Sequence, residues 1–263
     1  MATPGYVIDA SRIRRSRPRA ALAVGALLAL LLVLLTALAG CGVALGPIRI
    51  GNVGGAATAP SGPTHYAFSL AVMGASDAFG VGTDDPARLN WPTRLAHELP
   101  QPTRLLNLGI PGATLALAQR EELPVALDGR PNAIVIWMAV NDYIRNVSLA
   151  DYTATLRATL ATIRQLDPQT RVFVGDLPDL RYVPYFYGRD PVALYADTQA
   201  WNAAIAQASA DNGATLVDIG AAWGDLSNNQ QYLSQDGLHP STEGAQALAN
   251  YFSHVIRQTM GLG

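Results

Sequence analysis

Residues 132–142 read NAIVIWMAVND, and this stretch decides the class of fold. Its first nine residues form a short apolar run that contains several β-branched side chains, which is the character of a β-strand. Four other runs of the chain have the same character, so five strands are predicted. The five runs span residues 67–74, 104–110, 132–140, 171–177 and 215–219.

Helical patterns lie between and after these runs. Within residues 149–166, apolar side chains recur at spacings of three and four, and Ser148 is placed to cap that helix. Other predicted helices span residues 91–99, 192–210 and 241–260. Strands that alternate with helices predict an α/β fold, with a parallel sheet covered by helices on both faces. Such sheets bind ligands beyond the carboxyl ends of their strands, so functional residues are expected directly after each run.

The composition narrows the classes of partner. Of the 263 residues, 49% are hydrophobic, which allows a substantial core and excludes global disorder. The 18 basic residues are all arginine, and residues 41–263 carry 13 of them against 19 acidic residues, a net charge of about −6. An acidic body without basic runs argues against nucleic acid as a partner. A single cysteine excludes an internal disulfide framework and a cysteine-based zinc cluster.

Residues 1–40 have the pattern of a targeting segment. Five arginines lie between residues 12 and 19, and an uncharged apolar run follows over residues 20–40. This order is typical of a secretory signal, although about 20 apolar residues can also span a bilayer. The run ends in Leu38-Ala39-Gly40-Cys41, which resembles a bacterial lipobox. The resemblance implies that Cys41 becomes a lipidated N-terminus on an extracytoplasmic, membrane-anchored lipoprotein. An uncleaved single-pass anchor and plain secretion are the alternatives.

The rest of the chain divides into two parts. Residues 41–65 are rich in Gly, Ala and Pro and have no sustained periodicity, which predicts a flexible linker. Residues 66–263 contain all the predicted strands and form the predicted folded domain.

Candidate site residues follow three of the predicted strands, and a fourth set lies in a loop near the C-terminus; all are expected at the ligand-binding edge of the sheet. Ser76 follows the first strand at a tight turn, where a hydroxyl is exposed and suits a nucleophile. Gly112 follows the second strand and lets a backbone N–H approach a ligand, and the Asn141 amide follows the third. Asp236 lies three residues before His239, so its carboxylate can fix the imidazole tautomer and leave the other ring nitrogen as a base. Each feature alone also has an ordinary explanation: a helix cap, a turn glycine, an Asx turn and a surface loop.

Together, these residues and their order resemble the SGNH, or GDSL-like, hydrolase family over residues 67–260. The resemblance implies a flavodoxin-like three-layer α/β/α sandwich with a five-stranded parallel sheet. It implies that Ser76 is the nucleophile, Asp236 the acid and His239 the base. It places the oxyanion donors at Ser76, Gly112 and Asn141. The expected activity is that of an esterase or lipase that acts through an acyl-serine intermediate, without cofactor or metal, on a small-molecule, lipid or saccharide ester.

Two departures from the family pattern stand near the nucleophile. The family's Gly-Asp-Ser-Leu reads Gly74-Ala75-Ser76-Asp77 here, and Ala139 replaces a family glycine. The Gly-x-Ser-x-Gly elbow of the α/β-hydrolases is absent from the chain, which disfavours that class. The alternative to an enzyme is a ligand-binding lipoprotein with an SGNH-like fold. All five expected catalytic positions are present, and this weighs against a pure binder.

Three other features have two interpretations each. Asp176 and Asp179 follow the fourth strand and are either loop caps or ligands for a metal or a sugar hydroxyl. The aromatic loop at residues 182–187 either stacks on substrate or packs over the sheet. Trp137 lies within the third apolar run, which predicts a core position.

Overall fold

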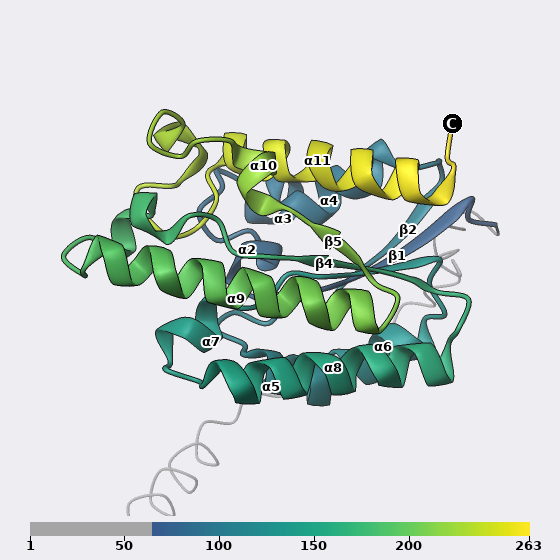
Figure 1. The fold of residues 1–263 in the computed structure, drawn as a ribbon. Helices are drawn as coiled ribbons and strands as arrows, with labels where there is room; N and C mark the ends of the chain where they lie inside the picture. The colour runs from purple at the N-terminus through teal and green to yellow at the C-terminus, as the bar shows by residue number, and fades with distance from the viewer. Residues whose placement is uncertain (1–64) are drawn as a thin grey trace, which may run out of the picture. The chain divides into compact units, whose positions relative to one another are not determined.

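The computed structural model describes residues 65–263, and the predicted targeting segment, Cys41 and nearly all of the linker lie outside them. Five parallel strands form one sheet in the order β2-β1-β3-β4-β5 (Figure 1). This is the flavodoxin-like strand order. β2 lies on one side of β1, and β3, β4 and β5 follow one another on its other side. The strands are β1 (Phe68–Met73), β2 (Thr103–Asn107), β3 (Ala133–Ile136), β4 (Arg171–Gly175) and β5 (Thr215–Val217).

Helices cover both faces of the sheet (Figure 1). One layer contains α3, α4, α10 and α11, and the other contains α5, α6, α8 and α9. The α-helices are α2 (Ser76–Phe79), α3 (Pro86–Leu89), α4 (Trp91–Glu98), α5 (Leu115–Glu121), α6 (Leu123–Asp128), α7 (Val140–Ile144), α8 (Leu149–Leu166), α9 (Pro191–Asp211), α10 (Ile219–Trp223) and α11 (Thr242–Met260). Three 3₁₀ turns are η1 (Leu180–Tyr182), η2 (Pro184–Phe186) and η3 (Gln230–Tyr232).

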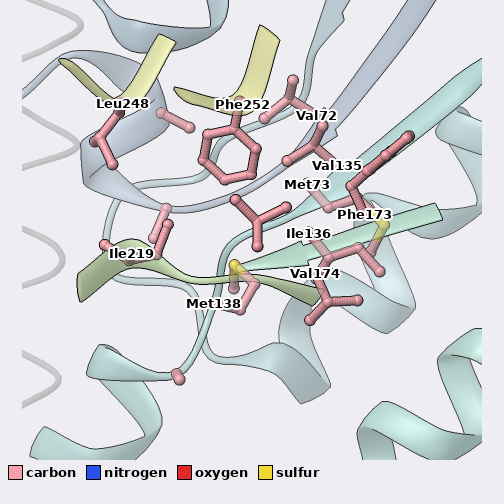
Figure 2. Close-up of a cluster of buried hydrophobic side chains, with 14 of the residues drawn as sticks. Val72, Met73, Val135, Ile136, Met138, Phe173, Val174, Ile219, Leu248 and Phe252 are labelled. Carbon is pink, nitrogen blue, oxygen red and sulfur yellow. The ribbon is translucent and has the colours of Figure 1, made fainter. Parts of the chain in front are cut away.

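The central strands are apolar because both of their faces are buried. Every residue of β3 is buried, and β1 is buried except at Ser69. One buried cluster joins side chains of β1, β3, β4 and α11 (Figure 2). Phe252 of α11 stacks on Trp91 of α4 with ring centroids 5.0 Å apart, which ties the two helices of this layer together.

The predicted α/β class, parallel sheet and five strands are confirmed. The helix predicted at residues 149–166 has those bounds, and the Ser148 hydroxyl caps it by accepting from the Asp151 N–H at 3.0 Å. Each predicted strand begins within one residue of the observed one but runs too far at its carboxyl end. After β3 and β4 the reason is that the next residues are also apolar, because Trp137, Met138, Val140 and Leu177 line a pocket.

The sequence pattern misses six short helices, α2, α3, α5, α6, α7 and α10. Each has four to seven residues, which is too short to show helical periodicity. Among residues 65–263, no helix is both long enough and apolar enough to cross a bilayer.

Candidate active site

The turn after β1 exposes the Ser76 hydroxyl. Ser76 is the first residue of α2, a single helical turn that ends at Gly80 in a left-handed conformation. Gly74 permits this turn, because a Cβ there would lie 2.6 Å from the Cβ of Ala78. The turn therefore brings α2 close against the end of β1, with Ser76 at the carboxyl edge of the sheet.

Ser76 meets the loop before α11 through a chain of hydrogen bonds. Ser76 Oγ lies 2.8 Å from Nε2 of His239, although the two residues are 163 positions apart. Nδ1 of the same ring lies 2.6 Å from Oδ2 of Asp236. A proton on Nδ1 is stabilised by the carboxylate, which leaves Nε2 to accept from the Ser76 hydroxyl. The structure thus brings together the three residues expected to relay a proton.

The Asp236 carboxylate is fixed by its own loop. Its Oδ1 accepts from the backbone N–H groups of Leu238 at 2.9 Å and His239 at 3.0 Å, and from the Ser234 hydroxyl at 2.8 Å. Partial burial opposes ionisation of Asp236, but the hydrogen bonds from His239 and Leu238 outweigh it and hold the pKa of this carboxyl below its usual value. Asp236 therefore carries a negative charge beside the imidazole at neutral pH.

Candidate donors for an oxyanion lie on the neighbouring loops. Gly112 has a φ of 78°, a conformation that favours glycine. Among residues 65–263, the N–H groups of Ser76 and Gly112 donate to no other protein group. The Asn141 amide donates one hydrogen to the Ala113 carbonyl at 2.9 Å, so its second hydrogen is available to a ligand. Arg145 donates to the Gly112 carbonyl at 3.0 Å and holds that loop from the far side.

A mainly apolar pocket opens beside the Ser76 hydroxyl. The space not filled by protein atoms here is about 630 Å³, a figure that includes open solvent at the pocket mouth. Its polar side chains are Ser76, Asp77, Asn141 and His239, and the remaining wall is apolar or aromatic. The apolar wall includes Trp137, Met138, Val140, Leu177, Leu180, Val183, Trp223 and Leu238. This composition suits an acyl group better than a polar sugar.

The core position predicted for Trp137 holds only in part, because the residue packs against the core cluster on one side. This residue lies just beyond β3, is half-buried and lines the pocket. Its indole N–H donates to the Asp176 carbonyl at 2.9 Å, and its ring meets Trp223 edge to face at 5.8 Å. A tryptophan that ends a buried strand has the same apolar signature as a core residue, so the sequence pattern does not separate the two.

The aromatic loop reaches the pocket through residues that the sequence pattern did not single out. Phe186 is buried, and Tyr185 and Tyr187 are 50% and 62% exposed. The residues of this loop region that line the pocket are instead Leu180 and Val183. The signal for them is their position after the fourth strand, at the edge where ligands are expected.

Asp176 and Asp179 act as caps. Asp176 is buried and accepts from the Ile219 N–H at 2.8 Å, and burial raises the pKa of its carboxyl to about 7. Asp179 accepts from the Arg181 N–H at 3.1 Å and pairs with the guanidinium of that residue at 2.6 Å. Within residues 65–263, the His, Cys, Asp and Glu side chains form no group of three or more suited to a metal ion.

The two departures near the nucleophile have structural counterparts. Asp77 replaces the missing carboxylate at Ala75, because its Oδ1 accepts from the Ala75 N–H at 3.3 Å and its Oδ2 from the Trp91 indole at 2.9 Å. Burial raises the pKa of Asp77, and the hydrogen bond from Trp91 acts in the opposite direction. Ala139 adopts a φ of 157°, which lies in the region that favours glycine.

Comparison with known proteins identifies the family. The sequence profile of the GDSL-like lipase/acylhydrolase family matches residues 72–247. The chain belongs to this family. It is therefore a carboxylic ester hydrolase of the GDSL type, and the expected family and fold are confirmed. No curated protein matches the chain.

Solved structures with the same fold include two esterases and a GDSL-like lipase. Esterase EstA from Pseudoalteromonas sp. is 17% identical, with 74% of this chain and 99% of that chain covered at a TM-score of 0.60. A GDSL-like lipase from Parabacteroides merdae ATCC 43184 is 19% identical, with 75% of this chain and 97% of that chain covered at a TM-score of 0.62. A variant of the acetylxylan esterase Axe2 from Geobacillus stearothermophilus is 17% identical, with 72% of this chain and 94% of that chain covered at a TM-score of 0.58. At these identities the similarity establishes the fold of this GDSL hydrolase.

Proposed function

We propose that this hydrolase cleaves carboxylic esters through an acyl-serine intermediate on Ser76. The observation that carries the proposal is the hydrogen-bonded chain from Ser76 Oγ through His239 to Asp236, with distances of 2.8 and 2.6 Å. In this chain the imidazole of His239 accepts from the Ser76 hydroxyl, and the carboxylate of Asp236 accepts from the other ring nitrogen.

The proposed reaction proceeds in two halves. His239 Nε2 takes the Ser76 proton as Oγ attacks the ester carbonyl, and the oxyanion accepts from the N–H groups of Ser76 and Gly112 and the Asn141 amide. Collapse of the tetrahedral intermediate breaks the carbon–oxygen bond of the ester, and His239 gives its proton to the leaving alcohol. Water then attacks the acyl-serine by the same route. His239 returns the proton to Ser76 and the acid is released.

The pocket supports an apolar acyl group as the preferred substrate part. Its apolar wall adjoins Ser76, while the polar side chains gather at the reacting end. A relative of the same fold is described as an acetylxylan esterase, and an O-acyl saccharide is the second substrate class to test. Hydrolysis of p-nitrophenyl esters of increasing acyl length, compared with acetylated xylan, ranks the two classes.

The decisive variant is Ser76→Ala. We expect it to lower kcat for short p-nitrophenyl esters by about 10⁴–10⁶-fold without changing the thermal melt. A fluorophosphonate probe is expected to label the wild type and not the variant; EstA, a relative, is described as inhibited by monoethylphosphonate. Activity that persists in purified Ser76→Ala protein would exclude the acyl-serine route. A wild type that resists both probe and substrates would instead favour a ligand-binding lipoprotein.

The proposed location is the outer side of the cytoplasmic membrane. Its support is sequence alone: the arginines at residues 12–19, the apolar run at 20–40 and the lipobox-like end at Cys41. Metabolic labelling with an alkyne fatty acid is expected to mark the wild type and not Cys41→Ala. Equal labelling of both proteins, or of neither, contradicts lipidation at Cys41 and leaves the uncleaved anchor and plain secretion.

A further inference from the structure

Glu122, a buried residue outside the proposed proton relay, contacts the turn that carries Ser76. Glu122 lies between α5 and α6 and is 1% exposed. Its Oε2 accepts from the Gly74 N–H at 3.0 Å. Its Oε1 is buried, and within residues 65–263 it has no hydrogen-bond partner. A carboxyl is costly to bury without a cation, so this placement calls for a specific role.

Glu122 touches the backbone of two loops of the site. Gly74 begins the segment that leads from β1 to Ser76. The N–H of Ile110, two residues before Gly112, also lies close enough to the carboxyl to favour its charged form. The same Ile110 N–H is 3.4 Å from the Gly74 carbonyl, so the two loops meet at this point. One side chain therefore connects the nucleophile turn with the glycine donor loop.

The three consecutive backbone N–H groups of residues 74–76 differ in their acceptors. Glu122 accepts from the Gly74 N–H, and Asp77 accepts from the Ala75 N–H on the other side of the turn. The next N–H, that of Ser76, has no protein acceptor among the described residues. Two carboxyls thus hold consecutive N–H groups and leave the third available to donate to a ligand.

We propose that Glu122 is a positioning residue for ester hydrolysis. It fixes the nucleophile turn against the Gly112 loop, so that the N–H groups of Ser76 and Gly112 face the same oxyanion. This inference rests on the proposed acyl-serine mechanism, because it assigns no chemistry of its own to Glu122. A donor pair that drifts apart loses affinity for the transition state more than for the substrate, so kcat rather than KM is the affected quantity.

The charge state of Glu122 supports this role. Burial raises the pKa of Glu122 to about 8, against the effect of the hydrogen bond from Gly74 and of the nearby Ile110 N–H. Asp77 of α2 is the titratable group that contributes to this shift among the described residues, and it acts in the same direction as burial. A protonated Glu122 adds no negative charge beneath the oxyanion. Glutamine, which is neutral and nearly isosteric, should therefore replace it.

The test compares Glu122→Ala and Glu122→Gln with the wild type on a short p-nitrophenyl ester. At pH 6 we expect Glu122→Ala to lower kcat by about 100-fold with KM nearly unchanged, the scale of a misplaced catalytic group. We expect Glu122→Gln to stay within about threefold of the wild type, because its amide oxygen accepts from the same N–H. Glu121→Ala, one residue earlier and exposed beside Arg120, is the control and should leave kcat unchanged.

A pH profile separates positioning from simple stability. As pH rises from 7 to 9, Glu122 ionises in the wild type and its charge opposes the oxyanion, so the kcat ratio of Glu122→Gln to wild type should rise. A wild-type kcat in folded Glu122→Ala, or a flat ratio across this range, overturns the inference. If circular dichroism shows that Glu122→Ala does not fold, the inference is tested by the pH dependence of the kcat ratio of Glu122→Gln to wild type. An inactive wild type in the same assay points to failure of the proposed function instead.

Discussion

The two halves of the site are built in different ways. The acid–base half lies within one short loop, where Asp236 binds both the ring and the backbone N–H of His239. The donor half is assembled from separate segments, which bring Ser76, Gly112 and Asn141 to the same edge of the sheet. The first half is specified locally and the second by the packing of the whole domain, so the two should respond differently to substitution.

The largest expected effect outside the nucleophile itself comes from the local half. Asp236→Asn keeps the shape of the side chain but removes the charge that holds the Nδ1 proton. The amide can donate to Nδ1 and so favour the wrong tautomer, in which Nε2 carries the proton and no longer accepts from Ser76. We expect kcat to fall by about 10⁴-fold, as measured on a p-nitrophenyl ester at neutral pH.

Asp225→Asn is a matched control for this substitution. Asp225 is exposed and accepts from the Ser227 N–H two residues later, as Asp236 accepts from Leu238, but it has no histidine partner among the described residues. Its substitution should leave kcat unchanged. If both variants were equally active, the carboxylate would have no part in catalysis, and the local half would be only a turn.

The donor half should be less sensitive to the loss of one group, because three donors share the oxyanion. Asn141→Ala removes the amide and leaves the two backbone N–H groups. We expect kcat to fall by about 10²–10³-fold with KM nearly unchanged, which is the usual loss for one oxyanion donor. Asn132→Ala, at the opposite end of β3, removes an amide that accepts from the Ser69 N–H and should not affect kcat. A change in KM alone would assign Asn141 to substrate binding.

The pocket wall belongs to neither half and should affect selectivity more than rate. Val140 is half-buried, begins α7 and lines the pocket, so Val140→Phe narrows the space for an acyl chain. We expect the ratio of kcat/KM for octanoyl over acetyl p-nitrophenyl esters to fall by about 10-fold or more, the scale of a few methylenes lost from an apolar pocket. Val125→Phe, at an exposed position of α6 away from the pocket, is the control. An unchanged ratio would place the acyl chain elsewhere.

The contrast between the halves also explains what the sequence predicts well. Asp236 and His239 are only three residues apart, so their side chains can meet within one loop. The pair can therefore be recognised from the sequence without knowledge of the fold. The sheet is predicted because buried parallel strands carry continuous apolar runs such as residues 133–136. The convergence of Ser76 with His239 follows only from the family resemblance, because 163 residues separate them.

Glu122 marks the limit of prediction from the sequence. It stands beside Glu121 in an ordinary helical stretch, and nothing in the pattern separates the buried residue from the exposed one. Its contact with Gly74 spans 48 residues and depends on how the α5–α6 junction packs under β1. The place of Trp137 in the pocket wall is missed for a related reason, because an apolar pocket wall and an apolar core have the same composition. Tertiary packing decides both cases.

The last expected effect is on stability rather than on rate, and it tests the charge state of this buried carboxyl. In the unfolded chain Glu122 loses its proton near its ordinary pKa of 4.5, whereas burial in the folded protein raises the pKa to about 8. Below pH 4.5 both states hold the proton and pH has no effect through this group. Between pH 4.5 and 8 only the folded state holds it, so the free energy of unfolding falls by up to about 1.4 kcal/mol per pH unit.

Glu122→Gln removes this dependence because glutamine does not titrate. The Tm of the wild type should therefore fall relative to that of the variant as pH rises from 5 to 8, by about 2–4 °C for each kcal/mol lost. Asp176, whose pKa burial also raises, contributes equally to both proteins and cancels in the difference. Thermal melts of both proteins and of Glu121→Gln across this pH range measure the gap. Parallel curves would mean that Glu122 is already ionised in the folded protein, and that the nucleophile turn rests on a charged carboxylate.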